Sequence, residues 1–142
     1  MKLIDVTASR LVPGPQADVF DVWLDPESPG GPWHGAKKVI LQPEVDGLFY
    51  IGMGHAGAIQ PHYGRFVTIE RPRRVVHTWM SESTHGLEST VEISFEPRAG
   101  GTQMTIVHRG LPDDESGRGH ERGWNYFLTA CEEQFAARAT SD

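Results

Sequence analysis

The sequence lacks most features of disulfide-bonded, membrane-spanning and nucleic-acid-binding proteins. Cys131 is its one cysteine, so no disulfide can form within the chain. No apolar run approaches the ~20 residues that a membrane-spanning helix needs, and the first residues, MKLIDVTASR, become polar too soon for a signal peptide. The net charge is −6 and no run of Lys or Arg is present, which argues against nucleic acid or anionic membranes as partners. We therefore expect a cytoplasmic protein without membrane insertion or a nucleic-acid partner.

Common catalytic and cofactor signatures are also missing. The chain has no G-x-S-x-G motif, phosphate loop or dinucleotide fingerprint. None of its seven histidines has a partner at the i, i+4 spacing of a helical zinc site, and there is no C-x-x-C. His55 and His62 flank one loop and could meet at a hairpin mouth, although a solvated loop is the commoner outcome. We expect no cofactor and no metal ion.

The one long stretch with helical periodicity lies near the C-terminus, from His120 to Arg138. Its apolar residues recur at i, i+3, i+4, i+7 and i+11 and form one stripe: Trp124, Phe127, Leu128, Cys131 and Phe135. Polar residues such as Asn125 and Glu132 fall on the opposite side. Another part of the chain must cover this stripe.

The remainder of the chain predicts mainly strands within a single domain, residues 1–142. Leu3–Val12 alternates as a strand, Gln16–Leu24 follows Pro15 as a short helix, and Asp25–Trp33 is a loop rich in Pro and Gly. Six further strands are predicted between turn residues and a loop over 55–62: Lys38–Gln42, Leu48–Gly54, Tyr63–Glu70, Arg74–Ser81, Ser89–Glu96 and Thr102–Arg109. Consecutive strands followed by one long helix predict an α+β fold, with an antiparallel sheet around the C-terminal helix.

Alternation along each strand predicts which residues face the helix. For Arg74–Ser81 the choice lies between the Val75 and Val76 faces, and we favour the first because it carries Trp79, the largest apolar side chain. The predicted inner residues are Phe49, Ile51, Met53, Tyr63, Val67, Ile69, Val75, His77, Trp79, Val91, Ile93, Phe95, Met104, Ile106 and His108.

Several short motifs, in order along nearly the whole chain, resemble a known superfamily. They include PQADVF at 15–20, DGLF at 46–49, GRFVTI at 64–69, RPRRVV at 71–76 and HRGL at 108–111. The set is similar to the START-like (SRPBCC) domains, related to the birch-pollen allergen, and within them to the branch of heat-shock-protein ATPase activator homologues. The resemblance implies a helix-grip fold, in which a curved sheet of six to seven strands wraps the C-terminal helix.

The resemblance also implies a cavity between sheet and helix for a hydrophobic small molecule. The residues that we expect to contact this ligand combine aromatic rings with a few polar groups: Phe49, Met53, Tyr63, His77, Trp79, His108, Trp124 and Phe127. The alternative is that these side chains only fill the core, with His77 and His108 hydrogen-bonded to backbone groups. The second short helix typical of the branch is replaced by the stiff loop Pro29–Trp33, which leaves the cavity entrance undefined.

Three functions compete at this point. We favour a domain that binds an apolar, aromatic or lipid-like molecule, with a homodimer left open. The alternative is a cyclase, hydratase or hydrolase that uses His77 or His108 with Tyr63 as acid and base. The third is a co-chaperone or regulatory protein, which would need a large exposed apolar patch.

Overall fold

Seven antiparallel strands form one curved sheet in the computed structural model, which describes residues 2–140 apart from the side chains of His55 and Thr140. The sheet order is β1-β7-β6-β5-β4-β3-β2. The strands are β1 (Leu3–Val12), β2 (Lys38–Leu41), β3 (Leu48–His55), β4 (Ala58–Glu70), β5 (Arg74–Ser81), β6 (Ser89–Arg98) and β7 (Gly101–Pro112). The helices are α1 (Gln16–Leu24), the single 3-10 turn η1 (Glu82–Thr84), α2 (Glu115–Arg118) and α3 (His120–Thr140).

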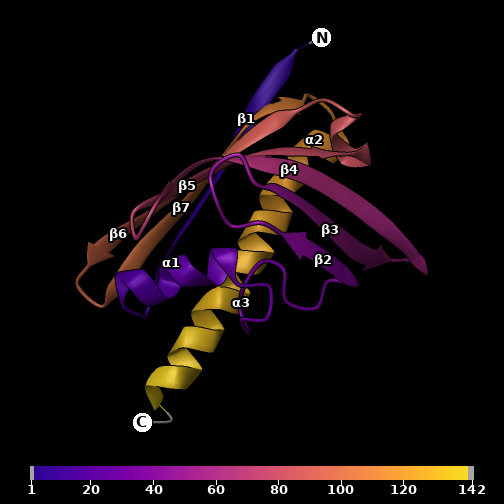
Figure 1. Cartoon of the computed structure of the whole chain (residues 1–142). Coiled ribbons are helices and arrows are strands. Elements are labelled where there is room, and N and C mark those ends of the chain that lie inside the picture. The colour runs from indigo at the N-terminus through magenta and orange to yellow at the C-terminus, as the bar shows by residue number, and fades with distance from the viewer. Residues whose placement is uncertain (1, 141–142) are drawn as a thin grey trace.

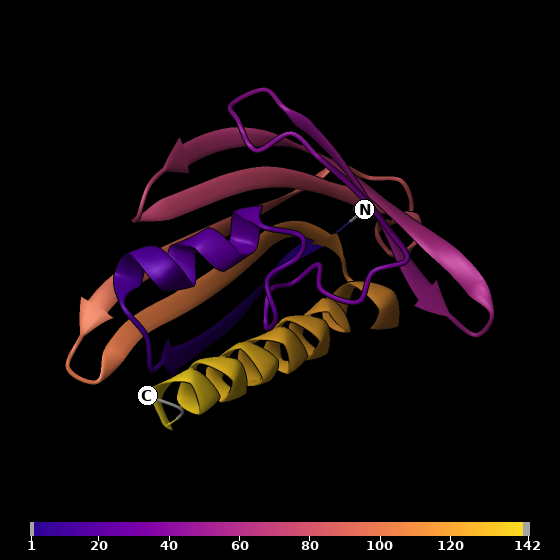
Figure 2. The same cartoon turned by 60° about the horizontal axis from the view of Figure 1, so that its bottom comes forward.

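The sheet wraps around α3, which confirms the predicted α+β helix-grip architecture (Figure 1). Turning the molecule shows α3 lying along the concave side of the sheet, with α1 beside it (Figure 2). The predicted apolar stripe of α3, from Trp124 to Phe135, is buried, with Leu128 and Cys131 fully so. On α1, Phe20 and Trp23 are fully buried, and the Phe20 ring meets that of Phe95.

The loop predicted over residues 55–62 is instead a tight hairpin. Ala56 and Gly57 both have positive φ angles, as in the two-residue turns that match the twist of paired strands. Ala58 therefore pairs with His55, and the pairing continues through Pro61, which faces Gly52. Pro61 is tolerated because β5 begins to pair with β4 only at His62, so the strand has one neighbour before that point.

The predicted inner face of β4 was wrong for two of its three residues. Tyr63 and Val67 are 45% and 46% exposed, whereas Phe66 is fully buried. The cause is a β-bulge: the pairing with β5 shifts between Phe66 and Thr68, which leaves Val67 as an extra residue. Ile69, beyond the bulge, packs against the core as expected.

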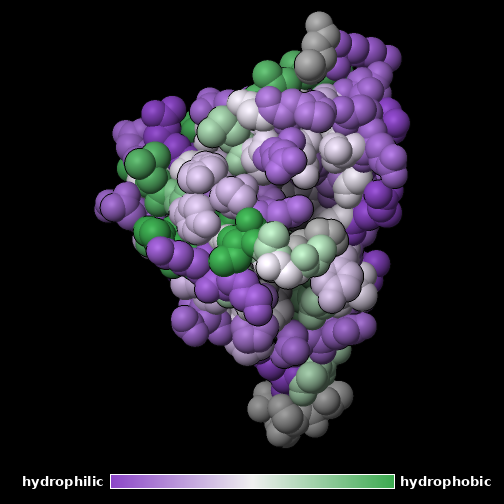
Figure 3. Space-filling model, turned by 90° about the vertical axis from the view of Figure 1, so that its right-hand side faces the viewer, coloured by the Kyte–Doolittle hydropathy of each residue, from purple (hydrophilic) through white to green (hydrophobic). Residues whose placement is uncertain are grey.

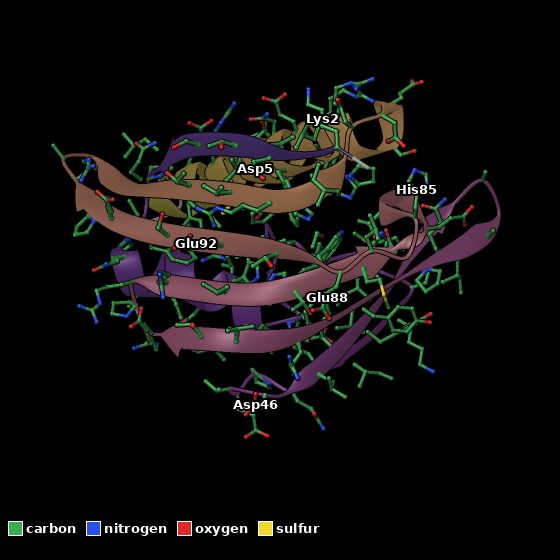
Figure 4. All side chains as sticks on the ribbon, turned by 90° about the horizontal axis from the view of Figure 1, so that it is seen from above. Lys2, Asp5, Asp46, His85, Glu88 and Glu92 are labelled. Carbon is green, nitrogen blue, oxygen red and sulfur yellow. The ribbon has the colours of Figure 1, made fainter. Side chains whose placement is uncertain are left out.

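The other inner faces agree with the sequence. Val75, His77 and Trp79 of β5 are buried, whereas Met80 is exposed. The outer face of the same part of the sheet is charged, and Glu92 of β6 accepts hydrogen bonds from Arg74 and Arg109 on the neighbouring strands. Figure 4 views this outer face from above, with Asp5 and Glu92 labelled on β1 and β6.

Candidate ligand-binding cleft

A cleft of about 780 Å³ opens between the first half of α3 and the ends of β3, β4 and β5. This volume is in the range of small-molecule sites. Its lining includes Gly30, Pro32, Trp33 and His34 of the loop after α1, Met53, His62, Trp79 and Ser83 of the sheet side, and Glu115, His120, Arg122, Gly123, Trp124, Phe127 and Gln134 of the helical side. The face that carries the β3–β4 hairpin mixes small apolar patches with hydrophilic residues (Figure 3).

The structure brings four of the eight predicted ligand residues to this cleft. They are Met53, Trp79, Trp124 and Phe127. Phe49, His77 and His108 are buried outside its lining. Tyr63 lies on the outer side of the bulged strand, where its ring meets that of Tyr50, so it does not join His77 or His108.

The loop that replaces the second short helix forms one wall. Gly30 has a φ of +81°, and a Cβ at this position would lie 2.8 Å from the Cβ of Gln134 on α3. The backbone of the loop therefore packs directly against the Gln134 side chain. The indole of Trp33 donates from Nε1 to the carbonyl oxygen of Trp23 at 2.7 Å. Its ring stacks against Trp79, with centroids 6.1 Å apart and planes 23° from parallel. Trp33 is thus a cleft residue that the sequence left in an undefined loop.

A chain of hydrogen bonds fixes Trp124 to the sheet. Its Nε1 donates to Nδ1 of His108 at 3.0 Å. Since Nδ1 accepts this bond, the proton of the neutral ring lies on Nε2, which donates to Ser89 Oγ at 2.7 Å. Ser89 in turn donates to the carbonyl oxygen of Trp79 at 2.7 Å. Burial, with the nearby His120 and His77, lowers the pKa of His108 to about 2, so its ring is neutral.

His77 is also a neutral core histidine. Its Nδ1 donates to the carbonyl oxygen of Thr78 at 2.8 Å, and burial lowers the pKa of the ring to about 4. Its Nε2 has no hydrogen-bond partner among the described residues, and the same is true of Nε1 of Trp23 and Trp79. His77 thus has the backbone hydrogen bond expected of a core histidine, whereas His108 is buried but bonds the side chains of Ser89 and Trp124 and no backbone group among the described residues.

Besides the exposed His34, the cleft is lined by His62 and His120. The sequence considered His62 only as a neighbour of His55 and did not single out His120. His120 begins α3, and Nδ1 donates to the carbonyl oxygens of Ser116 and Gly117 at 3.0 and 3.1 Å. His62 donates from Nδ1 to the carbonyl oxygen of Ile51 at 3.3 Å, and its ring lies 4.9 Å from that of Trp79. Burial lowers the pKa of both rings. His120 could have been found, because it lies one helical turn before Trp124 on the same face.

The acidic residues before α3 act mainly as caps and ion pairs. Asp114 accepts a hydrogen bond from the backbone N–H of Gly117 at 2.8 Å and caps α2. Asp113 pairs with Arg118 at 3.0 Å. Glu115 lies at the cleft. Over residues 2–140, no cluster of three His, Cys, Asp or Glu side chains has the geometry to hold a metal ion.

Whether His55 and His62 meet, the less favoured of the two expectations for this loop, lies outside the described side chains, because that of His55 is not among them. Within the described residues, no helix is long and apolar enough to cross a membrane.

Comparisons with known proteins agree with this architecture. An uncharacterised protein from Rhizobium leguminosarum aligns with a TM-score of 0.77 at 20% identity, covering 96% of each chain. An HSP90 activator from Plasmodium falciparum aligns with a TM-score of 0.76 at 18% identity, over 94% of this chain and 96% of its own. A putative protein of the dynemicin biosynthetic locus aligns with a TM-score of 0.75 at 18% identity, over 91% of this chain and 46% of its own. These TM-scores, at identities of 18–20%, establish a shared fold and no more. No curated protein matches the sequence.

A family match extends further along the sequence than any single motif. The profile described as "Activator of Hsp90 ATPase homolog 1-like protein" matches residues 13–135, which span α1, the loop that follows it, and α3 as far as Phe135. The chain therefore belongs to the family of Activator of Hsp90 ATPase homolog 1-like proteins.

Proposed function

We propose that this protein binds an apolar, ring-containing small molecule in the cleft between α3 and the sheet. The observation that carries the proposal is the aromatic lining: Trp33, Trp79, Trp124 and Phe127 come from three separate segments, the loop after α1, β5 and α3, and meet at one hollow. Polar side chains such as His62, His120 and Arg122 complete the lining, and apolar walls combined with placed polar groups are typical of ligand pockets.

The apolar surface that a ligand buries in the cleft sets the affinity to expect. A bicyclic aromatic ligand that buries about 250 Å² of apolar surface gains about 6 kcal/mol at ~25 cal/mol per Å². That gain corresponds to a dissociation constant of roughly tens of micromolar, before the costs of association are subtracted. Three of the four tryptophans line the cleft, so binding is measurable by their fluorescence.

Gly123 offers a direct test of the site. It lines the cleft, and a Cβ built on it meets no atom within 4 Å. Gly123→Leu therefore projects a side chain into the cleft from a Cβ that meets no neighbour, whereas Gly123→Ala leaves most of the space. We expect naphthalene and 2-methoxynaphthalene to quench the fluorescence of the wild type and of Gly123→Ala, and to bind Gly123→Leu at least tenfold more weakly. Equal binding by the leucine variant would place the ligand elsewhere.

An enzyme of the cyclase, hydratase or hydrolase kind remains the alternative, but it draws no support from the residues first expected to act as acid and base. Tyr63 is on the outer side of β4, and both ring nitrogens of His108 are engaged in hydrogen bonds.

A protein-binding role is a second candidate, because the outer face of the β2–β4 region is apolar. Ile40 opposes Tyr50, Tyr50 opposes Tyr63, and Tyr63 opposes Met80, which gives a row across four strands. Ile40 and Tyr63 are 52% and 45% exposed. If this row docks onto an Hsp90, as the family name suggests, the protein accelerates Hsp90 ATP hydrolysis and Ile40→Lys abolishes the effect. No acceleration by the wild type would remove this candidate.

A further inference from the structure

The cleft contains two hydrogen-bond acceptors that the fold itself does not use. A neutral histidine has one N–H and one lone pair, and a carbonyl oxygen can only accept a hydrogen bond. His120 bonds two carbonyl oxygens through Nδ1, so its proton is on Nδ1 and its lone pair is on Nε2. The same argument assigns the lone pair of His62 to Nε2, because Nδ1 faces the carbonyl oxygen of Ile51.

Neither Nε2 atom makes a hydrogen bond of ordinary geometry within residues 2–140, and the backbone of Gln60 is the other polar group close to the His62 ring. Neither is among the buried polar atoms that lack a hydrogen bond, and both side chains line the cleft. These two acceptors therefore reach the open space of the cleft. His108 differs, because both of its nitrogens are hydrogen-bonded, one to Ser89 of the sheet and one to Trp124 of α3.

Both cleft histidines are held in the neutral form. Each is partly buried, and burial is the largest influence that lowers the pKa of each ring. The charge that His120 would carry when protonated further lowers the pKa of His62. Two neutral imidazoles with outward lone pairs attract a hydrogen-bond donor and repel the lone pairs of a carboxylate.

Aromatic rings surround these acceptors. The His62 ring lies 4.9 Å from the Trp79 ring, and the His120 ring lies 5.0 Å from that of His108, which in turn holds Trp124. A ligand that fills the cleft is thus offered flat apolar walls and two acceptors at its edge.

We propose that the ligand is an uncharged hydroxylated aromatic compound, a phenol or naphthol in chemical class, whose hydroxyl groups donate to Nε2 of His62 and His120. The inference rests on the proposed binding function and names the chemistry of its ligand. Each hydroxyl exchanges water for a histidine acceptor, and the surrounding rings exclude the water that would otherwise compete.

Three probes of similar ring size test the proposal: naphthalene, 2-methoxynaphthalene and 2-naphthol. One net hydrogen bond is worth about a fivefold change in affinity. We expect 2-naphthol to bind the wild type at least fivefold more tightly than 2-methoxynaphthalene, by tryptophan fluorescence at pH 7.5. In His62→Phe/His120→Phe an aromatic ring is kept and the acceptors are lost. The ratio of the affinity for 2-naphthol to that for 2-methoxynaphthalene therefore falls to about one.

His34→Phe is the matched control. His34 also lines the cleft, but it is exposed and makes no hydrogen bond that would orient its ring within the described residues. We expect this variant to keep the wild-type ratio. If the double variant does not fold, His120→Phe alone replaces it and should lower the ratio by at least half.

The outcomes separate this inference from the binding function. A ratio near one in the wild type, or an unchanged ratio in the histidine variant, overturns the hydroxyl assignment even when all three probes bind and Gly123→Leu blocks them. Failure of all three probes to bind, or binding that Gly123→Leu leaves intact, instead overturns the binding function at this cleft.

Discussion

Acidification should destabilise this protein well above the pH at which carboxylates titrate, because His77 and His108 are neutral in the folded state. Burial is the largest influence on both, and it lowers the pKa of His77 to about 4 and that of His108 to about 2. In the unfolded chain both rings return to the ordinary histidine pKa of about 6.5. Below pH 6.5 the unfolded chain therefore binds protons that the folded chain does not, and stability falls as the pH falls.

The magnitude follows from the difference between the two states. Stability from these residues is complete above pH 6.5 and declines by about 1.4 kcal/mol per pH unit for each ring. The decline ends near pH 4 for His77 and near pH 2 for His108. Between pH 7.5 and pH 5.0 each ring costs about 2 kcal/mol, or about 4 kcal/mol together. His62 and His120, whose pKa values are also lowered by burial, act in the same direction.

Urea unfolding at the two pH values measures this difference. His108→Gln removes the titrating group, so its loss of unfolding free energy between pH 7.5 and pH 5.0 should be about 2 kcal/mol smaller than that of the wild type. His77→Gln should show a similar reduction, independently. Ile106→Val, fully buried on the same strand as His108, is the control: it lowers stability by about 1 kcal/mol at both pH values and leaves their difference unchanged. The same pH difference in the wild type and in His108→Gln would refute the assignment of a neutral buried His108.

Three further predictions concern the core stripe of α3, the loop after α1 and the inner face of β4. Leu128→Ala, at a fully buried position of α3, should lower the free energy of unfolding by about 2–5 kcal/mol in urea, and a loss under 1 kcal/mol would contradict the burial of the stripe. Gly30→Ala should lower the free energy of unfolding by about 1–3 kcal/mol, because φ is +81° and the new methyl group meets Gln134. Gly35→Ala, with a φ of +87° and open space around it, should lower that free energy less. Tyr63→Ala should leave the affinity for naphthalene within twofold of the wild type, because this ring is outside the cleft. Met53→Ala, at a position that lines the cleft, should weaken that affinity. Equal losses of affinity in the two variants would contradict the bulge in β4.

The sequence predicts the fold well, because each long element has a clear period. The stripe of α3 and the alternation on β5, β6 and β7 leave only one arrangement that buries Trp79, Ile93 and Leu128 together. The inner face of β4 could not be predicted in the same way. Strict alternation counted back from Ile69 puts Tyr63 inside, and only the pairing with β5 reveals the extra residue at Val67.

That single extra residue also explains why the sequence put Tyr63, and not His62, at the cleft. It turns Phe66 inward, and regular alternation from Phe66 then brings His62 to the concave side in place of Tyr63. The alternation also continues through Pro61, in a segment whose Gly, His and Pro content is typical of loops. An imidazole therefore occupies a position where the sequence predicted a phenol.

Hydrogen bonds hold two tryptophans of the cleft in place in the absence of a ligand. Trp33 is held through Nε1 by the carbonyl oxygen of Trp23, and Trp124 is held through Nε1 by His108. Two walls of the cleft are therefore fixed before any ligand arrives, and their side chains lose little conformational freedom on binding. In contrast, His62 and His120 are fixed through Nδ1 and leave Nε2 open. The apolar walls thus supply affinity at low entropic cost, whereas the two open nitrogens decide which aromatic molecules are accepted.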